Sequence, residues 1–258
     1  MADLPGLSID NTSGALRSCW HPVARSEHVG LQPVRVELLG QGYVVSRLDG
    51  TTVVAFEDRC PHRFGRLSDG TVADGALSCP YHGWQFNHDG SCRLIPALGP
   101  DAVVPKRACL EPLAVCERYG LVWLAPVAPS IPLIEIAEWA DPALTPIWLP
   151  DVDIRASAAQ FIDNFLDFAH FPFVHNGTFG NAESPFLHDY SVEKHRHGLV
   201  VHYEHTIANH EDPLVATGQH PLVQPRIMRY EYTVPFSALL RLELPIGASG
   251  VQIGRAHV

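Results

Sequence analysis

The sequence of 258 residues lacks any run of about 18 apolar residues, the length that a membrane-spanning helix needs. Its start, MADLPGLSID, has acids and a proline where a secretory signal peptide needs a basic patch and an apolar core. It also lacks a net positive charge, because 28 acidic residues against 18 basic ones give a formal net charge of −10. That balance disfavours nucleic acid and anionic membranes as partners. We therefore expect a cytoplasmic protein with neither partner.

Disulfides are not expected either, although the chain has six cysteines, because a cytoplasmic protein of this size does not keep them. Cys60 and Cys79 lie in short loop sequences next to histidines. The remaining cysteines are interpreted as small packing residues: Cys19, Cys92, Cys109 and Cys116.

Residues 60–84, CPHRFGRLSDGTVADGALSCPYHGW, contain two short pairs of metal-binding side chains. Cys60-Pro61-His62 is followed, after sixteen residues, by Cys79-Pro80-Tyr81-His82. A Cys₂His₂ set can bind zinc, so the residue types alone do not decide the metal. Zinc fingers, however, group two Cys before two His on a helix, and the prolines disfavour helix at both pairs. A [2Fe–2S] centre with two thiolates on one iron and two imidazoles on the other needs one Cys and one His from each loop.

The pattern C-x-H-x16-C-x-x-H, within CPHR and CPYHGW, resembles the Rieske domain of Rieske non-haem iron oxygenases. The resemblance implies that Cys60, His62, Cys79 and His82 bind a Rieske-type [2Fe–2S] cluster. A zinc-stabilised binding domain is the alternative for the same four residues.

Short strands and turns are predicted around both ligand pairs. Segments such as VRVELLG and TTVVAFED are rich in β-branched residues and end at Gly or Asp-Gly turns. Hairpins are predicted at Asp49-Gly50, at Asn87–Gly90 and at Tyr119-Gly120.

These patterns divide the chain into domains. After an N-terminal segment over 1–14, an all-β domain is predicted over 15–125. The proline-rich APVAPSIP begins a linker, 126–146. Over 147–251, one helix followed by strands predicts an α+β domain, so the fold class of the whole chain is α+β.

The α+β domain contains a second set of candidate ligands in QFIDNFLDFAHFPFVH (160–175). Asn164, Asp167 and His170 recur at i, i+3 and i+6, which predicts one polar face of a helix. Pro172 is expected to end or kink that helix, so that His175 turns back toward His170. Two neutral imidazoles with one carboxylate form the facial triad of non-haem Fe(II) oxygenases. The structural alternative is an amphipathic helix with surface histidines.

The motif N-x-x-D-x-x-H-x4-H resembles the mononuclear iron site of the same oxygenase family. The resemblance implies that His170 and His175 are Fe(II) ligands, that Asp167 is a bridging carboxylate, and that Asn164 lies beside it. In the family a third ligand, an aspartate, follows in a later helix, and neither Asp189 nor Asp212 has such a context. The other histidines of this region are expected on exposed faces: His195, His197, His202, His205 and His210.

The last residues, IGRAHV, match one reading frame of a common short-read sequencing adapter. We therefore interpret 252–258 as an artefact, and a genuine terminus is the alternative. On the first interpretation the natural chain continues past about Val251. The domain over 147–251, for which the family resemblance implies a helix-grip-like fold, is then incomplete. We therefore expect the chain as given to be inactive.

By resemblance the function is that of the terminal oxygenase (alpha) subunit of the vanillate and dicamba O-demethylase type. Such a subunit uses O₂ and electrons from an NAD(P)H-dependent reductase or ferredoxin to hydroxylate or O-demethylate a small, aromatic or otherwise hydrophobic substrate. The family also implies a head-to-tail homotrimer. A ring-dihydroxylating or steroid-hydroxylating oxygenase is the alternative within the family. A Rieske-type electron carrier without catalysis is the alternative from another class, and it would end near residue 125.

Overall fold

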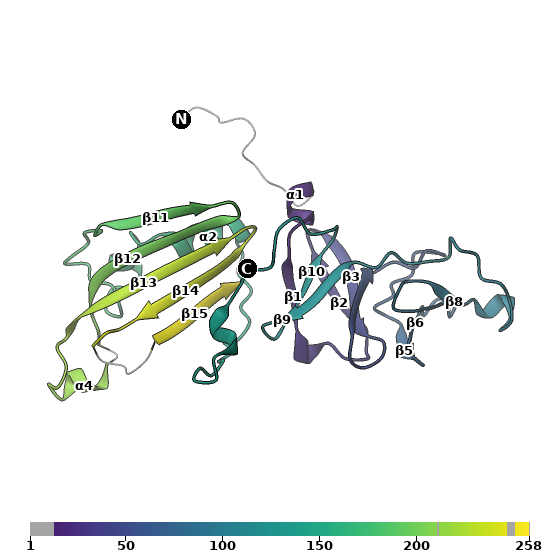
Figure 1. Ribbon diagram of the computed structural model, residues 1–258, viewed down its shortest axis with the longest axis horizontal. Helices are drawn as coiled ribbons and strands as arrows, with labels where there is room; N and C mark the ends of the chain where they lie inside the picture. Colours follow the sequence, from purple (N-terminus) through teal and green to yellow (C-terminus); the bar gives the residue numbers. More distant parts are fainter. Residues whose placement is uncertain (1–12, 211, 247–250, 258) are drawn as a thin grey trace, which may run out of the picture. The chain divides into compact units, whose positions relative to one another are not determined.

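The computed structural model describes residues 13–210, 212–246 and 251–257, the last of these by their backbone alone (Figure 1). The chain divides into two compact units, residues 1–144 and 145–258. Strands dominate both units, and the longer helical segment belongs to the second. This is the α+β fold that the sequence predicts. Among the described residues, no helix is long and apolar enough to cross a membrane.

The first unit is built from three small antiparallel sheets. The first sheet contains β1 (His21–Arg25), β10 (Leu121–Ala125) and β9 (Ala114–Arg118). The second contains β2 (Val34–Leu38), β3 (Gln41–Arg47) and β4 (Val53–Glu57). The third contains β5 (Thr71–Ala73), β6 (Ala76–Ser78), β7 (Gln85–Phe86) and β8 (Cys92–Leu94). Its helical turns are α1 (Gly14–Arg17), η1 (Ser26–His28), η2 (Pro96–Leu98) and η3 (Ala137–Ala140).

All three predicted hairpins are confirmed. β3 pairs antiparallel with β4 around Asp49-Gly50, β7 with β8, and β9 with β10. The Asp49 carboxylate Oδ1 accepts the backbone N–H groups of Thr51 and Thr52 at 2.8 and 2.7 Å, so the side chain fixes the turn locally. Gly50 follows with a φ of +80°, a conformation that glycine adopts without steric cost.

The core of the four-stranded sheet encloses two of the predicted ligands. Cys60 and Cys79 belong to one buried apolar cluster together with Leu67, Leu77 and Phe86, all of them at most 2 % exposed. One packed core therefore anchors both ligand loops through their cysteines.

The segment expected to be a linker, 126–146, packs against the first unit over part of its length. The Val127 N–H donates to the Arg17 carbonyl at 3.1 Å, and the Ile136 N–H donates to the Tyr119 hydroxyl at 2.9 Å. Ile136 itself is buried.

The second unit is a five-stranded antiparallel meander with short helices. Its strands lie in the order of the sequence: β11 (Tyr190–His195), β12 (Gly198–Ala208), β13 (Val223–Thr233), β14 (Ser237–Glu243) and β15 (Val251–His257). Its helices are α2 (Ala158–Leu166), α3 (Phe171–Val174) and α4 (Pro213–Ala216). The stretch interpreted as an artefact includes most of β15, whose backbone pairs with β14.

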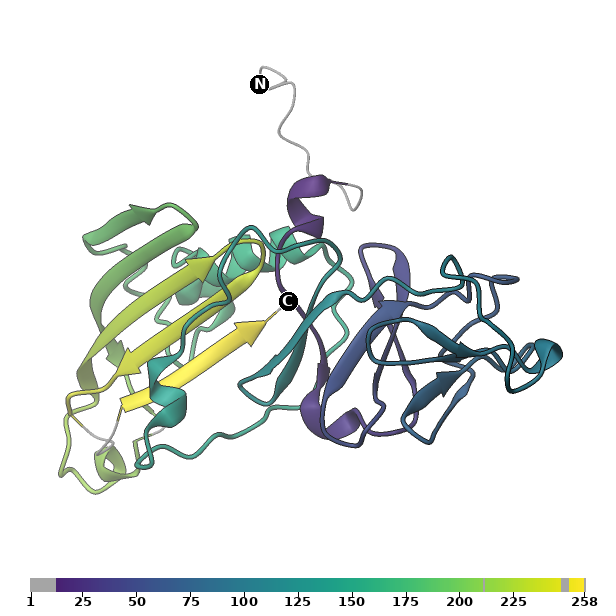
Figure 2. The same cartoon turned by 45° about the vertical axis from the view of Figure 1, so that its right-hand side comes forward.

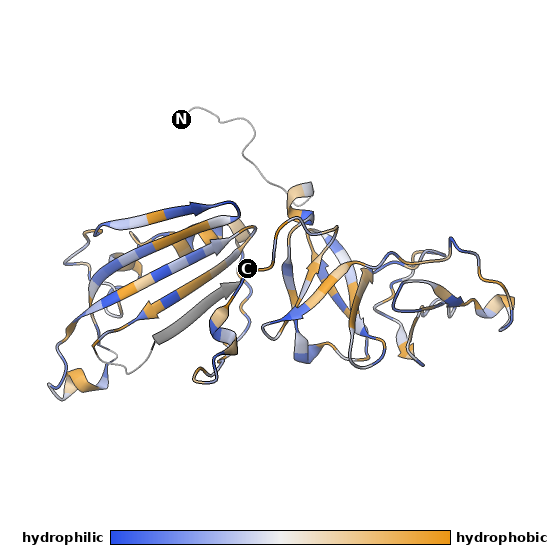
Figure 3. Ribbon diagram, in the orientation of Figure 1, coloured by the Kyte–Doolittle hydropathy of each residue, from blue (hydrophilic) through white to orange (hydrophobic). Residues whose placement is uncertain are grey.

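One face of this sheet carries the core of the second unit, and α2 lies behind the sheet as drawn (Figure 2). Apolar and polar residues alternate along the central strands, as the bands of colour show (Figure 3). On β13 the even-numbered residues Arg226, Met228 and Tyr230 are buried, whereas the odd-numbered ones are partly exposed. Met228 and Tyr230 pack with Phe168 and Phe171, which places the α2–α3 segment against this inner face.

Candidate metal centres

The first ligand loop is a tight turn closed by two backbone hydrogen bonds. The Cys60 N–H donates to the Gly65 carbonyl, and the Phe64 N–H donates to the Cys60 carbonyl, both at 2.9 Å. Phe64 has a φ of +59°, which is costly for a residue with a side chain.

The second loop repeats this geometry. The Cys79 N–H donates to the Trp84 carbonyl at 2.8 Å, and the Gly83 N–H donates to the Cys79 carbonyl at 2.9 Å. Gly83 has a φ of +72° at the position that Phe64 takes in the first loop. Two chain segments of different sequence therefore present their cysteines in the same way.

The two thiols lie in contact with each other at the base of the loops. Both cysteines are 2 % exposed. Burial, and after it the neighbouring Cys79 thiol, raises the pKa of the Cys60 thiol to about 11. The backbone N–H groups of His62 and Arg63 point at the Cys60 sulfur and act in the opposite direction. Such N–H groups stabilise a sulfur that carries negative charge, as a thiolate bound to iron does.

The two histidines lie together toward the outside. The His62 and His82 ring centroids are 4.5 Å apart, and His62 stacks on Trp84 at 4.7 Å and 6°. The Nδ1 atom of His62 is buried and has no hydrogen-bond partner among the described residues. Two buried thiols below two imidazoles, one with an unused inner nitrogen, fit a [2Fe–2S] cluster with mixed ligands.

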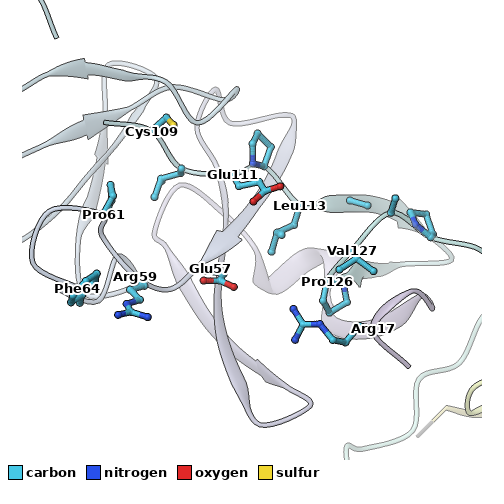
Figure 4. Close-up of a pocket in the computed structure, with 15 residues that line it drawn as sticks. Arg17, Glu57, Arg59, Pro61, Phe64, Cys109, Glu111, Leu113, Pro126 and Val127 are labelled. Atoms are coloured by element: carbon cyan, nitrogen blue, oxygen red, sulfur yellow. The ribbon is translucent and has the colours of Figure 1, made fainter. Parts of the chain in front are cut away.

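A hollow of about 830 Å³ lies beside the first loop and is separate from the four candidate ligands. Phe64 and Arg59 lie at one end of it, with the Arg59 guanidinium 3.8 Å from the Phe64 ring centroid, and Arg17 lies at the other end (Figure 4). Glu57 and Glu111 add negative charge to the lining. None of the candidate metal ligands lines this hollow.

In the second unit, the prediction of one continuous helical face through Asn164, Asp167 and His170 is wrong. Helix α2 begins with a capping box between Ser157 and Gln160 and ends at Leu166, with Asp167 as its C-cap. The Asp167 carboxylate Oδ1 accepts the Ala169 N–H at 2.8 Å, which turns the chain out of the helix.

Pro172 does not end a helix but lies in the first turn of α3, where a missing N–H costs nothing. The corner between α2 and α3 nevertheless brings the candidate ligands together. Asp167 Oδ2 lies 3.2 Å from His170 Nδ1, and the His170 and His175 ring centroids are 5.2 Å apart. A carboxylate on Nδ1 leaves Nε2 of His170 for a metal.

The surroundings of His175 favour the neutral form that a metal ligand needs. Its pKa is lowered by burial, and further by the charges of His170 and Arg226. Its ring stacks on Phe179 at a centroid distance of 4.3 Å. Two oriented imidazoles fit a mononuclear iron of the histidine and carboxylate class.

Asn164 and Asp167 share a second, polar hollow of about 420 Å³, which Gln160, Asp163 and Leu166 complete. The Asn164 carbonyl accepts the Asp167 N–H at 3.3 Å, so the two residues are also linked through the backbone.

Neither downstream aspartate is placed as a third ligand. Asp189 is exposed outside any helix or strand. Asp212 is buried and accepts hydrogen bonds from His220 and Gln224, both at 2.8 Å. Among the described residues, no three His, Cys, Asp or Glu side chains converge on one ion. The [2Fe–2S] ligand set does not require this, because each iron takes only two protein ligands.

Sequence reasoning missed two residues on the inner face of the sheet. His205 was expected on an exposed face, and this is wrong: it lies on β12 directly opposite the buried Arg226 of β13. Burial, together with the charges of Arg226 and His188, lowers the pKa of His205 to about 4. The alternation in GLVVHYEHTIA contains the signal, because His205 shares a face with Tyr203 and Ile207, which are both buried.

Comparison with known proteins identifies both units. The Rieske [2Fe-2S] domain family matches residues 19–115, and the vanillate O-demethylase oxygenase C-terminal domain matches residues 154–258. The chain is 39 % identical over 184 residues to methylxanthine N1-demethylase NdmA of Pseudomonas putida, a match that covers 67 % of the chain and 52 % of that protein. It is 31 % identical over 181 residues to the 3-chlorobenzoate-3,4-dioxygenase oxygenase subunit of Comamonas testosteroni, covering 68 % of the chain and 41 % of that protein. The chain thus spans about half the length of these relatives.

Solved structures agree with this assignment. NdmA of Pseudomonas putida CBB5 with caffeine superposes with a TM-score of 0.77 at 29 % identity, covering 95 % of this chain and 70 % of that one. Dicamba monooxygenase bound to 3,6 dichlorosalicylic acid superposes with a TM-score of 0.71 at 21 % identity, covering 93 % and 72 %. The second likeness concerns the fold alone.

Proposed function

This chain belongs to the Rieske oxygenase alpha subunits, since it joins a Rieske [2Fe-2S] domain to a vanillate O-demethylase oxygenase C-terminal domain, and from this premise we propose that it is a terminal oxygenase component. The proposed reaction uses O₂ and two electrons to hydroxylate or demethylate a small aromatic substrate. The electrons come from a reductase, directly or through a ferredoxin. Relatives named as a demethylase and as a dioxygenase support this reaction class.

When bound, the [2Fe–2S] cluster supplies one-electron transfer and the mononuclear iron supplies O₂ reduction at the substrate. In the proposal Cys60, Cys79, His62 and His82 hold the cluster. The exposed His82 imidazole gives electrons an outer edge from which to leave.

His170 and His175 hold the iron in the second unit, and Asp167 fixes His170 through its Nδ1. The Asn164 carbonyl in turn accepts the Asp167 N–H. We place the electron route from His82 of one subunit to Asp167 and His170 of the next, within a head-to-tail homotrimer. Such a heterologous contact closes into a ring when its rotation allows.

The observation that carries this proposal is the contact of Asp167 with His170 beside His175. An electron carrier without catalysis needs only the first unit. Nothing in carrier chemistry requires an imidazole pair oriented by a carboxylate in the second.

The test combines the purified full-length protein, a reductase, NADH and panels of methoxylated aromatics and methylxanthines, with formaldehyde as the product assayed. Formaldehyde that depends on O₂ and on the reductase supports the proposal. A red-brown protein whose cluster is reduced and reoxidised without any substrate oxidation would instead indicate an electron carrier. A colourless protein containing zinc would exclude both.

A further inference from the structure

The two histidines of the candidate cluster site differ in what covers their rings. The Trp84 indole lies almost parallel to the His62 imidazole, at a centroid distance of 4.7 Å and an angle of 6°. His62 is half-buried. The ring of His82 contacts that of Tyr81 at 4.1 Å and 35°, and both of these residues are exposed. One face of His62 is therefore shielded by an indole, whereas the surroundings of His82 are open to water.

Trp84 is itself held in place from two directions. Its side chain packs against the buried apolar cluster that contains Cys60 and Cys79. Its ring centroid lies 6.5 Å from that of Phe86, which is 0 % exposed. Its backbone carbonyl accepts the Cys79 N–H at 2.8 Å. Trp84 thus connects the buried thiol end of the site to the His62 imidazole, and the core of the first unit fixes the position of its ring.

The shielding of a ligand affects the energy of reduction. A [2Fe–2S] centre with two thiolates and two neutral imidazoles has no net charge when oxidised, and reduction makes it negative. Its reduction potential therefore depends on solvent exposure and on hydrogen bonds. Water beside a ligand stabilises the added negative charge, whereas the face of an aromatic ring is itself partially negative. A ring that covers a ligand is expected to lower the potential.

We propose that Trp84 is a positioning residue that lowers the reduction potential of the cluster, because it excludes water from one face of His62 and holds that ring in place. Its action on the cluster passes through His62. The proposal rests on the cluster ligands of the proposed function. It goes beyond them, since it gives a part in electron transfer to a residue that binds no metal.

Redox titration of the purified holoprotein, followed by the Rieske EPR signal, tests this without substrate or turnover. Trp84→Leu should shift the reduction potential to a more positive value than that of the wild type, because the smaller side chain admits water to His62. The g values should change as well, since the imidazole is oriented less firmly. Trp84→Phe should give an intermediate potential, because a smaller flat ring still covers part of His62. Both variants should keep the iron and sulfide content of the wild type.

Trp139→Leu is the matched control. Trp139 belongs to the same unit, and its ring meets that of Tyr119 edge-on at a centroid distance of 5.9 Å. The same replacement is made there on an indole that contacts Tyr119, so the potential should stay at the wild-type value. An equal shift in Trp139→Leu and Trp84→Leu would overturn the proposal, because the stack on His62 would then not be its source.

An intact cluster in Trp84→Leu at the wild-type potential, or at a more negative one, would also overturn the proposal. If Trp84→Leu binds no cluster, Trp84→Phe decides. A more positive potential in Trp84→Phe then supports the proposal. The wild-type potential, or a second loss of the cluster, would show that Trp84 serves the fold alone.

These outcomes are separable from the proposed function. An unchanged Rieske EPR signal in His62→Ala would reject His62 as a ligand, and with it the route by which Trp84 acts. An unchanged potential in Trp84→Leu, with the signal lost in His62→Ala, would reject the role of Trp84 alone. Formaldehyde production tests the oxygenase independently of either result.

Discussion

Asp167 orients His170: its Oδ2 atom lies 3.2 Å from His170 Nδ1, while its Oδ1 atom accepts the Ala169 N–H. One carboxylate thus ends helix α2 and fixes the ring of a candidate iron ligand. A proton on Nδ1 faces the carboxylate, so Nε2 is the ring nitrogen that remains for a metal.

In the full-length protein, Asp167→Asn should keep the iron and the cluster but lower the turnover by about 100-fold. The amide retains the size and some hydrogen bonding, but it loses the charge that holds His170, and changes of this kind cost ~10–100-fold. Metal analysis and steady-state oxidation of a substrate measure both parts. Asp163→Asn, one turn earlier on α2, is the control and should stay near wild type. Wild-type turnover in Asp167→Asn would show that the carboxylate serves only to end the helix.

Replacing a cluster ligand should abolish the Rieske EPR signal and the visible colour. Cys60→Ser and His62→Ala each remove a donor whose binding is coupled to folding of its loop. Cys92→Ser is the matched control, since Cys92 is buried in the same apolar cluster but its thiol donates to the Leu94 carbonyl. Its signal should persist. An unchanged signal in Cys60→Ser or His62→Ala would remove that residue from the ligand set.

Local turn chemistry made much of the first unit predictable. Asp49-Gly50 specifies its hairpin through contacts within four residues, and β-branched runs specify the strands on either side. The equivalence of the two ligand loops was not predictable. Gly83 suggests a positive φ in the second loop, but nothing in the sequence suggests that Phe64 takes a positive φ at the same position of the first loop. Tertiary closure of the loop overrides the preference of phenylalanine.

The geometry of the second unit was less predictable from the sequence. The spacing of Asn164, Asp167 and His170 suggested one helix, but a side-chain hydrogen bond from the Ala169 N–H to Asp167 breaks it. The burial of Arg226 on the inner face depends on strand register, which places it opposite His205, 21 positions earlier in the sequence. Sequence spacing carries no information about such a pair until the alternation of both strands is considered.

Gly83→Ala should destabilise the first unit by about 1–3 kcal/mol, whereas Phe64→Gly should change its stability by less than about 1 kcal/mol. An alanine at Gly83 would keep a φ of +72° and place its Cβ 3.1 Å from Pro96 Cγ. Phe64→Gly removes the strain of the same backbone conformation, at φ +59°, but it also removes the contact between the Phe64 ring and Arg59. Denaturant unfolding followed by circular dichroism measures both. An equal cost for the two variants would contradict the equivalence of the loops.

The pair of Arg47 and Glu117 should make the first unit sensitive to acid. The Arg47 guanidinium donates two hydrogen bonds to the Glu117 carboxylate and joins strands β3 and β9. This contact holds the pKa of Glu117 below its ordinary value of 4.5.

A carboxyl group whose pKa is lower in the folded state stabilises the fold above its unfolded pKa, and that contribution disappears as the pH falls through the folded pKa. Glu117→Gln should therefore lower the melting temperature at pH 7 by about 2–4 °C, as expected for a pair worth ~1 kcal/mol. Below the folded pKa of Glu117 the wild type and Glu117→Gln should melt together. Glu27→Gln is the control, because Glu27 lies 3.7 Å from His28 and 3.9 Å from Arg25 with its side chain 68 % exposed. A melting difference between wild type and Glu117→Gln that stays constant from pH 7 into acid would show that the ion pair is not its source.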